Sequence, residues 1–227
     1  MKHLKPFLRI FSIILLIELI LISTPDWWSY RIFTKPLVVG SLLVFFLMQQ
    51  VNQMTKKLVS AALILCIIGD ILLIYARNST EFFIAGVSAF MIGHIFYAIQ
   101  FSRIRNKNVG VLAPLAVLLG YAIPLFYYLS NALYNMAIPV GIYVVVLLIM
   151  ILFAYLREDS TTNNSYIYVL AGALLFMLSD SILAITKFKI DIPFSKILVM
   201  GIYGIAQLLM IIGILKNSVN SPSINSN

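Results

Sequence analysis

The stretches AALILCIIGDILLIY (61–75) and AGALLFMLSDSILAI (171–185) are long apolar runs, and each is interrupted by one aspartate. Such runs predict helices that cross a membrane, because about 20 residues of apolar α-helix span about 30 Å of hydrocarbon. Asp70 and Asp180 would then lie inside the bilayer, where a charged side chain costs at least ~2.5 kcal/mol on insertion scales. The sequence therefore predicts a functional site within the membrane, built around these two carboxylates.

The composition of the chain supports the membrane assignment. Apolar residues make up 62% of the 227 residues and charged residues 11%, against roughly 25% charged residues in soluble domains. Polar breaks separate eight apolar stretches, near 7–23, 36–51, 57–76, 82–101, 109–129, 135–156, 165–186 and 195–215. We predict an all-α integral membrane bundle of eight transmembrane helices, formed by residues 1–216 as one domain. The polar remainder (217–227) is expected to be a disordered tail.

The basic residues predict the orientation of the chain. With a cytoplasmic N-terminus, ten Lys and Arg residues fall on the cytoplasmic side and six on the opposite side. The positive-inside rule then places both termini in the cytoplasm, and the compact chain suggests a bacterial cytoplasmic membrane. The net charge of +8 does not indicate a nucleic-acid partner, because it is spread over loop ends rather than gathered on one surface.

The two acidic motifs are similar in layout. In both, a small residue precedes the aspartate and an apolar turn follows it, as in GDILL (69–73) and SDSILA (179–184). The predicted helices also run in the same direction. With a rise of about 1.5 Å per residue, both carboxylates lie roughly 20 Å from the cytoplasmic face. This pattern hints at a parallel repeat of four helices plus four, although apolar helices also resemble one another by composition alone.

Further polar residues fall inside the predicted helices. They are Lys35, His94, Tyr143, Tyr203 and Gln207. Lys35 opens the second predicted helix, with Pro36 in its first turn. Tyr203 and Gln207 are four residues apart and therefore share a helical face. We expect these side chains to line one polar pocket together with the two aspartates.

Each of these residues also has a purely structural interpretation. His94 can be a packed core histidine, the tyrosines can bridge helices, and Lys35 can extend toward the membrane interface. Glu18, in the first predicted helix, can face a helix partner. Asp70 and Asp180 can pair with Lys or His between helices. At the level of the sequence these alternatives stay open.

Four motifs, in this order, resemble those of the YhhN-like lysoplasmalogenase family: TKPL (34–37), GDILL (69–73), GVSAFMIGHIFY (86–97) and GALLFMLSDSILAITKF (172–188). The ordered set spans nearly the whole chain. The resemblance implies an integral membrane hydrolase that cleaves the vinyl-ether bond of lysoplasmalogens to a fatty aldehyde and a glycerophospho-alcohol. Matched by position, the polar residues it implies are Lys35, Asp70, His94, Asp180 and, at weaker matches, Tyr143, Tyr203 and Gln207.

The chemistry of this reaction suits two carboxylates. Vinyl-ether hydrolysis begins with protonation of the alkene carbon beta to oxygen; water then adds to the oxocarbenium ion, and the hemiacetal collapses. The reaction needs an acid and a base, which two carboxylates in different surroundings supply in glycosidases. We therefore predict Asp70 and Asp180 as catalytic residues, with water as co-substrate and with neither cofactor nor metal. The sequence leaves open which aspartate is the acid.

The expected partner is a lysophospholipid drawn from the membrane. Its vinyl ether lies just beneath the glycerol and phosphate, near the depth predicted for the aspartates. Lys35, above them, would then hold the phosphate by charge. On this hypothesis, replacement of Lys35 by Ala weakens substrate binding more than it slows the chemical step.

Two alternative functions remain at this stage. A metal held by Asp70, Asp180 and His94 is one, although zinc hydrolases usually supply three protein ligands that include several histidines. A proton- or cation-coupled transporter with the aspartate pair as coupling site is the other. Against a transporter, Pro114, Pro124 and Pro139 fall in the fifth and sixth predicted helices, away from both aspartates.

Overall fold

The structure is a computed structural model that describes residues 3–76 and 79–220. The long helices are α1 (Leu4–Ser23), α2 (Arg31–Leu47), α3 (Gln53–Tyr75), α4 (Thr80–Ser102), α5 (Leu112–Leu133), α6 (Ala137–Tyr155), α7 (Asn163–Phe188) and α8 (Ser195–Asn220). Short 3-10 helices, η1 (Pro25–Tyr30) and η2 (Tyr134–Met136), connect α1 to α2 and α5 to α6. This part of the chain contains no strand, so the predicted all-α class is confirmed.

Two helix boundaries differ most from the prediction. Helix α2 begins at Arg31, so Pro36 lies inside the helix rather than in its first turn. The earlier start follows from Glu18 of α1, which binds both Arg31 and Thr34 in the first turn of α2. Helix α8 continues to Asn220, beyond the predicted domain end, and the rest of the predicted tail (221–227) lies outside the described residues.

The helices have the length and apolarity of membrane-spanning segments. Among the described residues, seven segments meet both conditions. One of them, Leu112–Tyr155, is 44 residues long and contains both α5 and α6. Tyr134 interrupts it with a φ of 42°, a backbone conformation that non-glycine residues rarely adopt. The chain is thus that of a multi-pass integral membrane protein.

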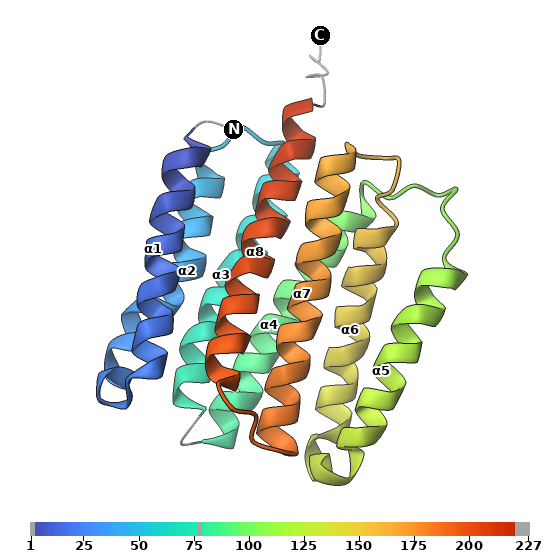
Figure 1. Ribbon diagram of the computed structural model, residues 1–227. Coiled ribbons are helices and arrows are strands. Elements are labelled where there is room, and N and C mark those ends of the chain that lie inside the picture. Colours follow the sequence, from blue (N-terminus) through green and yellow to red (C-terminus); the bar gives the residue numbers. More distant parts are fainter. Residues whose placement is uncertain (1–2, 77–78, 221–227) are drawn as a thin grey trace.

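Six helices form a closed ring. Within the described chain, α2 contacts α3, α3 contacts α4, α4 contacts α6, α6 contacts α7, α7 contacts α8, and α8 returns to α2. Helix α1 packs outside the ring on α2 and α8, and α5 packs outside it on α6 and α7. In Figure 1, α1 and α5 accordingly lie at opposite flanks of the bundle. The first turn of α1 and the last turns of α8 lie at the same end.

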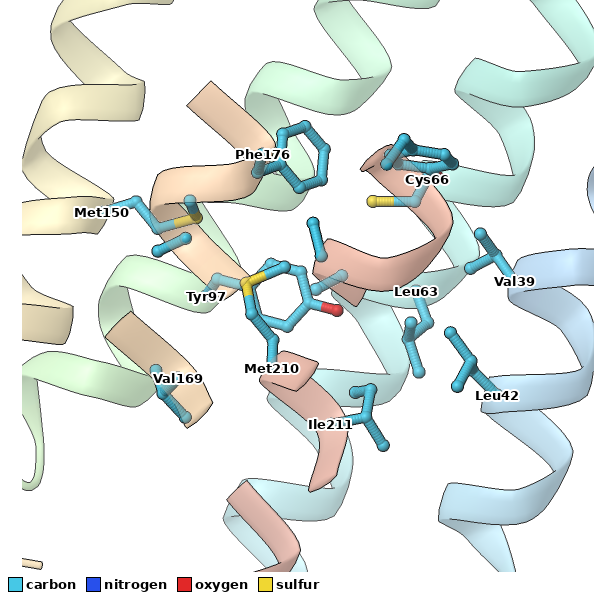
Figure 2. Packing of buried hydrophobic residues seen from close by; sticks show 14 of the residues in the cluster. Val39, Leu42, Leu63, Cys66, Tyr97, Met150, Val169, Phe176, Met210 and Ile211 are labelled. Atoms are coloured by element: carbon cyan, nitrogen blue, oxygen red, sulfur yellow. The ribbon is translucent and has the colours of Figure 1, made fainter. Parts of the chain in front are cut away.

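Apolar side chains fill the ring near that end. Figure 2 shows residues from all six ring helices meeting around Tyr97, among them Leu42 of α2, Leu63 of α3, Met150 of α6 and Met210 of α8. Each of these side chains is almost fully buried. Because this half of the ring is packed with side chains, the space for a site lies in the other half.

Candidate active site

A cavity of about 120 Å³ lies between the helices, with walls from α2 to α8. It is in the half of the bundle away from the termini, since most of its lining residues come from the C-terminal halves of α3, α5 and α7 and the N-terminal halves of α2, α4, α6 and α8. Most of the lining is apolar. The polar lining residues are Lys35, Asp70, Tyr121, Tyr143, Ser179, Asp180, Ser181 and Tyr203. Both predicted catalytic aspartates therefore face one apolar-walled space.

Asp70 is held from two sides. Its side chain is almost fully buried on α3. One carboxylate oxygen, Oδ2, accepts a hydrogen bond of 2.9 Å from the hydroxyl of Tyr203 on α8. The other, Oδ1, lies 3.4 Å from the ammonium of Lys35 on α2. The structure thus pairs Asp70 with Lys35, one of the interhelical pairings that the sequence left open.

A close approach of α3 and α4 positions Asp70. A Cβ atom placed on the preceding residue, Gly69, would lie 2.7 Å from the ring of Phe90, and one on Gly86 would lie 2.9 Å from Leu73. The small residue before the aspartate therefore lets an aromatic ring of α4 pack directly against α3. This contact fixes the last turns of α3, from which Asp70 faces the cavity.

Asp180 has different surroundings. It lies half-buried on α7 and accepts a hydrogen bond from the hydroxyl of Tyr143 on α6. Within the described chain no cation forms an ion pair with it. The serines on either side connect α7 to its neighbours: Ser179 donates to the carbonyl of Val199 on α8, and Ser181 accepts from Tyr121 on α5.

His94 and Gln207 lie beside the cavity rather than in its wall. The His94 ring is fully buried, with its centroid 5.5 Å from that of Tyr143 and 4.5 Å from that of Phe176. Neither of its ring nitrogens has a hydrogen-bond partner in the described structure. Gln207 accepts from the Tyr97 hydroxyl and donates to the Cys66 sulfur. The structure therefore brings five of the seven predicted residues into the cavity and places these two behind it.

Glu18 forms a separate buried cluster. Its Oε1 accepts from Nε and Nη2 of Arg31 at 2.9 and 2.8 Å, and its Oε2 accepts from Thr34. The Arg31 guanidinium also lies over the ring of Trp28, 4.2 Å from its centroid. Glu18 thus faces a helix partner, and this structural interpretation explains its position in an apolar helix.

Tyr121 and Ser181 are cavity residues that the sequence reasoning missed. Ser181 directly follows Asp180, and Tyr121 lies near the middle of α5, within the largely apolar run from Val117 to Phe126. Asp70 was selected because it is a polar residue in the middle of a predicted membrane helix. The same criterion would have selected Tyr121.

The alternative of a metal site requires the side chains of Asp70, Asp180 and His94 to converge on one point. Among the described residues, no three His, Cys, Asp or Glu side chains come close enough together to hold a metal ion. His94 in particular lies behind the cavity wall, so the set of Asp70, Asp180 and His94 does not form.

A bundle of membrane-length apolar helices that encloses two carboxylates in an apolar-walled cavity defines a polytopic membrane protein with an intramembrane polar site. Residues 30–214 match the YhhN family, and the chain belongs to this family. The family resemblance predicted from the four motifs is thereby confirmed.

Named relatives cover most of the chain. It is 30% identical over 216 residues to lysoplasmalogenase TMEM86B of Mus musculus, a match that covers 95% of this chain and 88% of the relative. It is 29% identical over 197 residues to lysoplasmalogenase TMEM86A of Homo sapiens, which covers 83% of this chain and 78% of the relative. No solved structure matches the chain significantly.

Proposed function

We propose that this protein is a lysoplasmalogenase, a hydrolase that cleaves the vinyl-ether bond of 1-alkenyl lysophospholipids to a fatty aldehyde and a glycerophospho-alcohol. The observation that carries the proposal is the pair of aspartates, from α3 and α7, in the wall of one apolar cavity. The names of its relatives support the same activity. They do not favour a transporter.

The surroundings of the two aspartates suggest their roles. A nearby cation favours the ionised form of a carboxyl, whereas an apolar setting without one favours the neutral form. Asp70, beside the Lys35 ammonium, is proposed as the base. Asp180, held by the Tyr143 hydroxyl, is proposed as the acid, because an un-ionised carboxyl can donate its proton to an alkene carbon.

The proposed cycle returns both groups to their starting state. Asp180 protonates the alkene carbon beta to oxygen, and the ether carbon becomes an oxocarbenium ion that the Asp70 carboxylate stabilises. Water adds to that carbon as Asp70 takes its proton, which gives a hemiacetal. In the collapse, Asp70 returns the proton to the departing glycerol oxygen while Asp180 takes the proton of the hemiacetal hydroxyl. The products are an aldehyde and an alcohol.

The cavity also suits the substrate and water. Its polar residues gather around the aspartates, and its apolar walls extend along α5, where Leu125, Phe126 and Leu129 face the space. We propose that the alkenyl chain lies along these residues, with the glycerol and phosphate toward Lys35. Water enters as the second substrate.

We further propose a topology of eight transmembrane crossings with both termini in the cytoplasm of a bacterial cell. The turn at Tyr134 supports two crossings within Leu112–Tyr155, because α5 and α6 contact each other along the bundle. A 4+4 repeat is supported by equivalent contacts: α2 with α3 matches α6 with α7, and α4 with α6 matches α8 with α2. In this repeat Asp70 and Asp180 occupy equivalent helices.

Aldehyde release from a 1-alkenyl lysophospholipid tests the function. The detergent-purified protein is assayed beside the 1-acyl and 1-alkyl analogues, with Asp70→Asn and Asp180→Asn as variants. We expect aldehyde from the alkenyl lipid alone, and its loss in both variants when they remain folded by size-exclusion chromatography. No aldehyde from folded, lipid-supplemented wild-type protein would overturn the proposal, and cation-coupled flux in liposomes would then point to transport.

A further inference from the structure

Tyr121 of α5 and Ser181 of α7 meet in the cavity wall next to Asp180. Their hydroxyl oxygens are 2.9 Å apart, and the Ser181 oxygen is also 2.7 Å from the backbone carbonyl oxygen of Met177. Tyr121 is the only polar residue that α5 contributes to the described cavity lining. Neither hydroxyl has a part in the acid–base cycle proposed above.

The proton positions in this pair follow from its partners. A carbonyl oxygen can only accept a hydrogen bond, so the contact with Met177 uses the single proton of Ser181. Ser181 has no second proton, and Tyr121 must therefore donate to it. Both hydroxyl protons are then engaged inside the protein. The pair presents only oxygen lone pairs to the cavity, and the unused acceptor capacity lies mainly on Tyr121.

An acceptor of this kind selects a hydrogen-bond donor. In a lysophospholipid, the glycerol carbon next to the one that bears the alkenyl ether carries a free hydroxyl at the sn-2 position. In a two-chain lipid the same oxygen is part of an ester and has no proton. An ester or ether oxygen at this place has no proton to donate, and Tyr121 has none left to offer, so the hydrogen bond that the free hydroxyl makes would be lost.

We propose that Tyr121, oriented by Ser181, recognises the sn-2 hydroxyl and makes the enzyme selective for single-chain lipids. This inference rests on the proposed function. It assigns to the hydroxyl pair a role in specificity, in addition to the chemistry of the two aspartates. Sites that hydrogen-bond a substrate hydroxyl discriminate strongly against analogues that lack it.

The test compares two substrates with the same alkenyl chain and headgroup, one with a free sn-2 hydroxyl and one with that hydroxyl methylated. The wild-type protein should prefer the free hydroxyl by about tenfold or more in kcat/KM. In Tyr121→Phe, kcat/KM for the free hydroxyl should fall about tenfold or more while that for the methyl ether changes little. The preference should therefore collapse.

Ser181→Ala is a second variant with a different expected result. Without Ser181, the Tyr121 proton is released and can be donated to an ether oxygen. In this variant, kcat/KM for the methylated substrate should rise relative to kcat/KM for the free hydroxyl, so the preference should be smaller than in the wild type. Tyr127→Phe serves as the matched control, because Tyr127 lies on the same helix, is 80% exposed and does not line the cavity. Its ratio should equal that of the wild type.

The two kcat/KM values are measured on the same protein sample. Their ratio therefore does not change when a variant contains a smaller fraction of folded protein. Equal losses on both substrates in Tyr121→Phe would overturn the inference and would instead indicate that Tyr121 positions water. A wild-type protein that hydrolyses both substrates equally would overturn it as well. No hydrolysis of either substrate would overturn the proposed function itself, an outcome distinct from the other two.

Discussion

The two aspartates of the cavity are the same residue type in unlike surroundings. Asp70 has Lys35 and Tyr203 as partners, whereas Asp180 accepts a hydrogen bond from Tyr143. Two carboxyls take opposite parts in one reaction when their environments favour different protonation states. The sequence identified both residues, but the assignment of roles depends on partners from three other helices.

Replacement of Lys35 by Ala should lower kcat for aldehyde release by about 10- to 100-fold, equivalent to about 1.4 to 2.7 kcal/mol of barrier. The ion pair with Asp70 accounts for this, because a buried carboxyl without its cation favours the neutral form, which can neither stabilise the oxocarbenium ion by charge nor take a proton from water. Lys35→Arg, which retains a cation, should keep more activity. A raised KM with unchanged kcat would mean that Lys35 binds the phosphate without supporting Asp70.

Replacement of Glu18 by Gln should destabilise the protein by about 3 to 5 kcal/mol, because it leaves the buried Arg31 without its counter-ion. A large decrease in the melting temperature in detergent would show this. Asp26→Asn, at an exposed acidic position of η1, is the control and should melt like the wild type. The double variant Glu18→Leu with Arg31→Met should recover much of the loss; a Glu18→Gln protein with unchanged melting would contradict the role of the pair.

At the scale of the helices, glycines set how closely neighbours pack. A Cβ atom on Gly172 of α7 would lie 2.7 Å from the carbonyl oxygen of Ala206 and 2.9 Å from the backbone nitrogen of Met210, both on α8. A Cβ on Gly213 of α8 would lie 2.9 Å from the backbone nitrogen of Val169 on α7. Small residues let helix backbones approach closely in membranes, where dispersion contacts are a principal driving force.

Gly172→Ala should therefore separate α7 from α8 and cost about 1 to 3 kcal/mol, seen as a lower melting temperature in detergent. Gly120→Ala on α5 is the matched control, because a Cβ there meets no atom within 4 Å. The control should be neutral or slightly stabilising, since alanine favours helix more than glycine by about 1 kcal/mol. Equal melting of the two variants would mean that α7 and α8 tolerate the added methyl group.

At the scale of the whole molecule, the interior of the six-helix ring has two unlike halves along the length of the bundle. Apolar side chains fill the half near the termini, as Figure 2 shows, and the cavity occupies the other half. Helix α5 lies outside the ring yet contributes Tyr121 to the cavity wall. The site therefore depends on seven helices at once, and no smaller part of the chain contains it.

The proposed topology predicts which loops are accessible from each side of the membrane. Cys66 is the only cysteine and is fully buried, so it should not react with maleimides in the folded protein. In intact cells, a membrane-impermeant maleimide should label Asp191→Cys, in the exposed connection between α7 and α8. It should label Lys107→Cys, between α4 and α5, only after the cells are permeabilised. Labelling in the reverse order would place the termini outside.

The sequence by itself determined the class of the fold, most helix boundaries and the two aspartates. These follow from local quantities: the length and apolarity of each run, and the cost of a carboxylate within it. The tertiary structure decided what each polar residue faces. It placed His94 behind the cavity, paired Lys35 with Asp70 and brought Tyr121 to Ser181, residues 60 positions apart in the chain. Such contacts depend on how helices rotate and pack against one another, which the apolar pattern of any single helix does not encode.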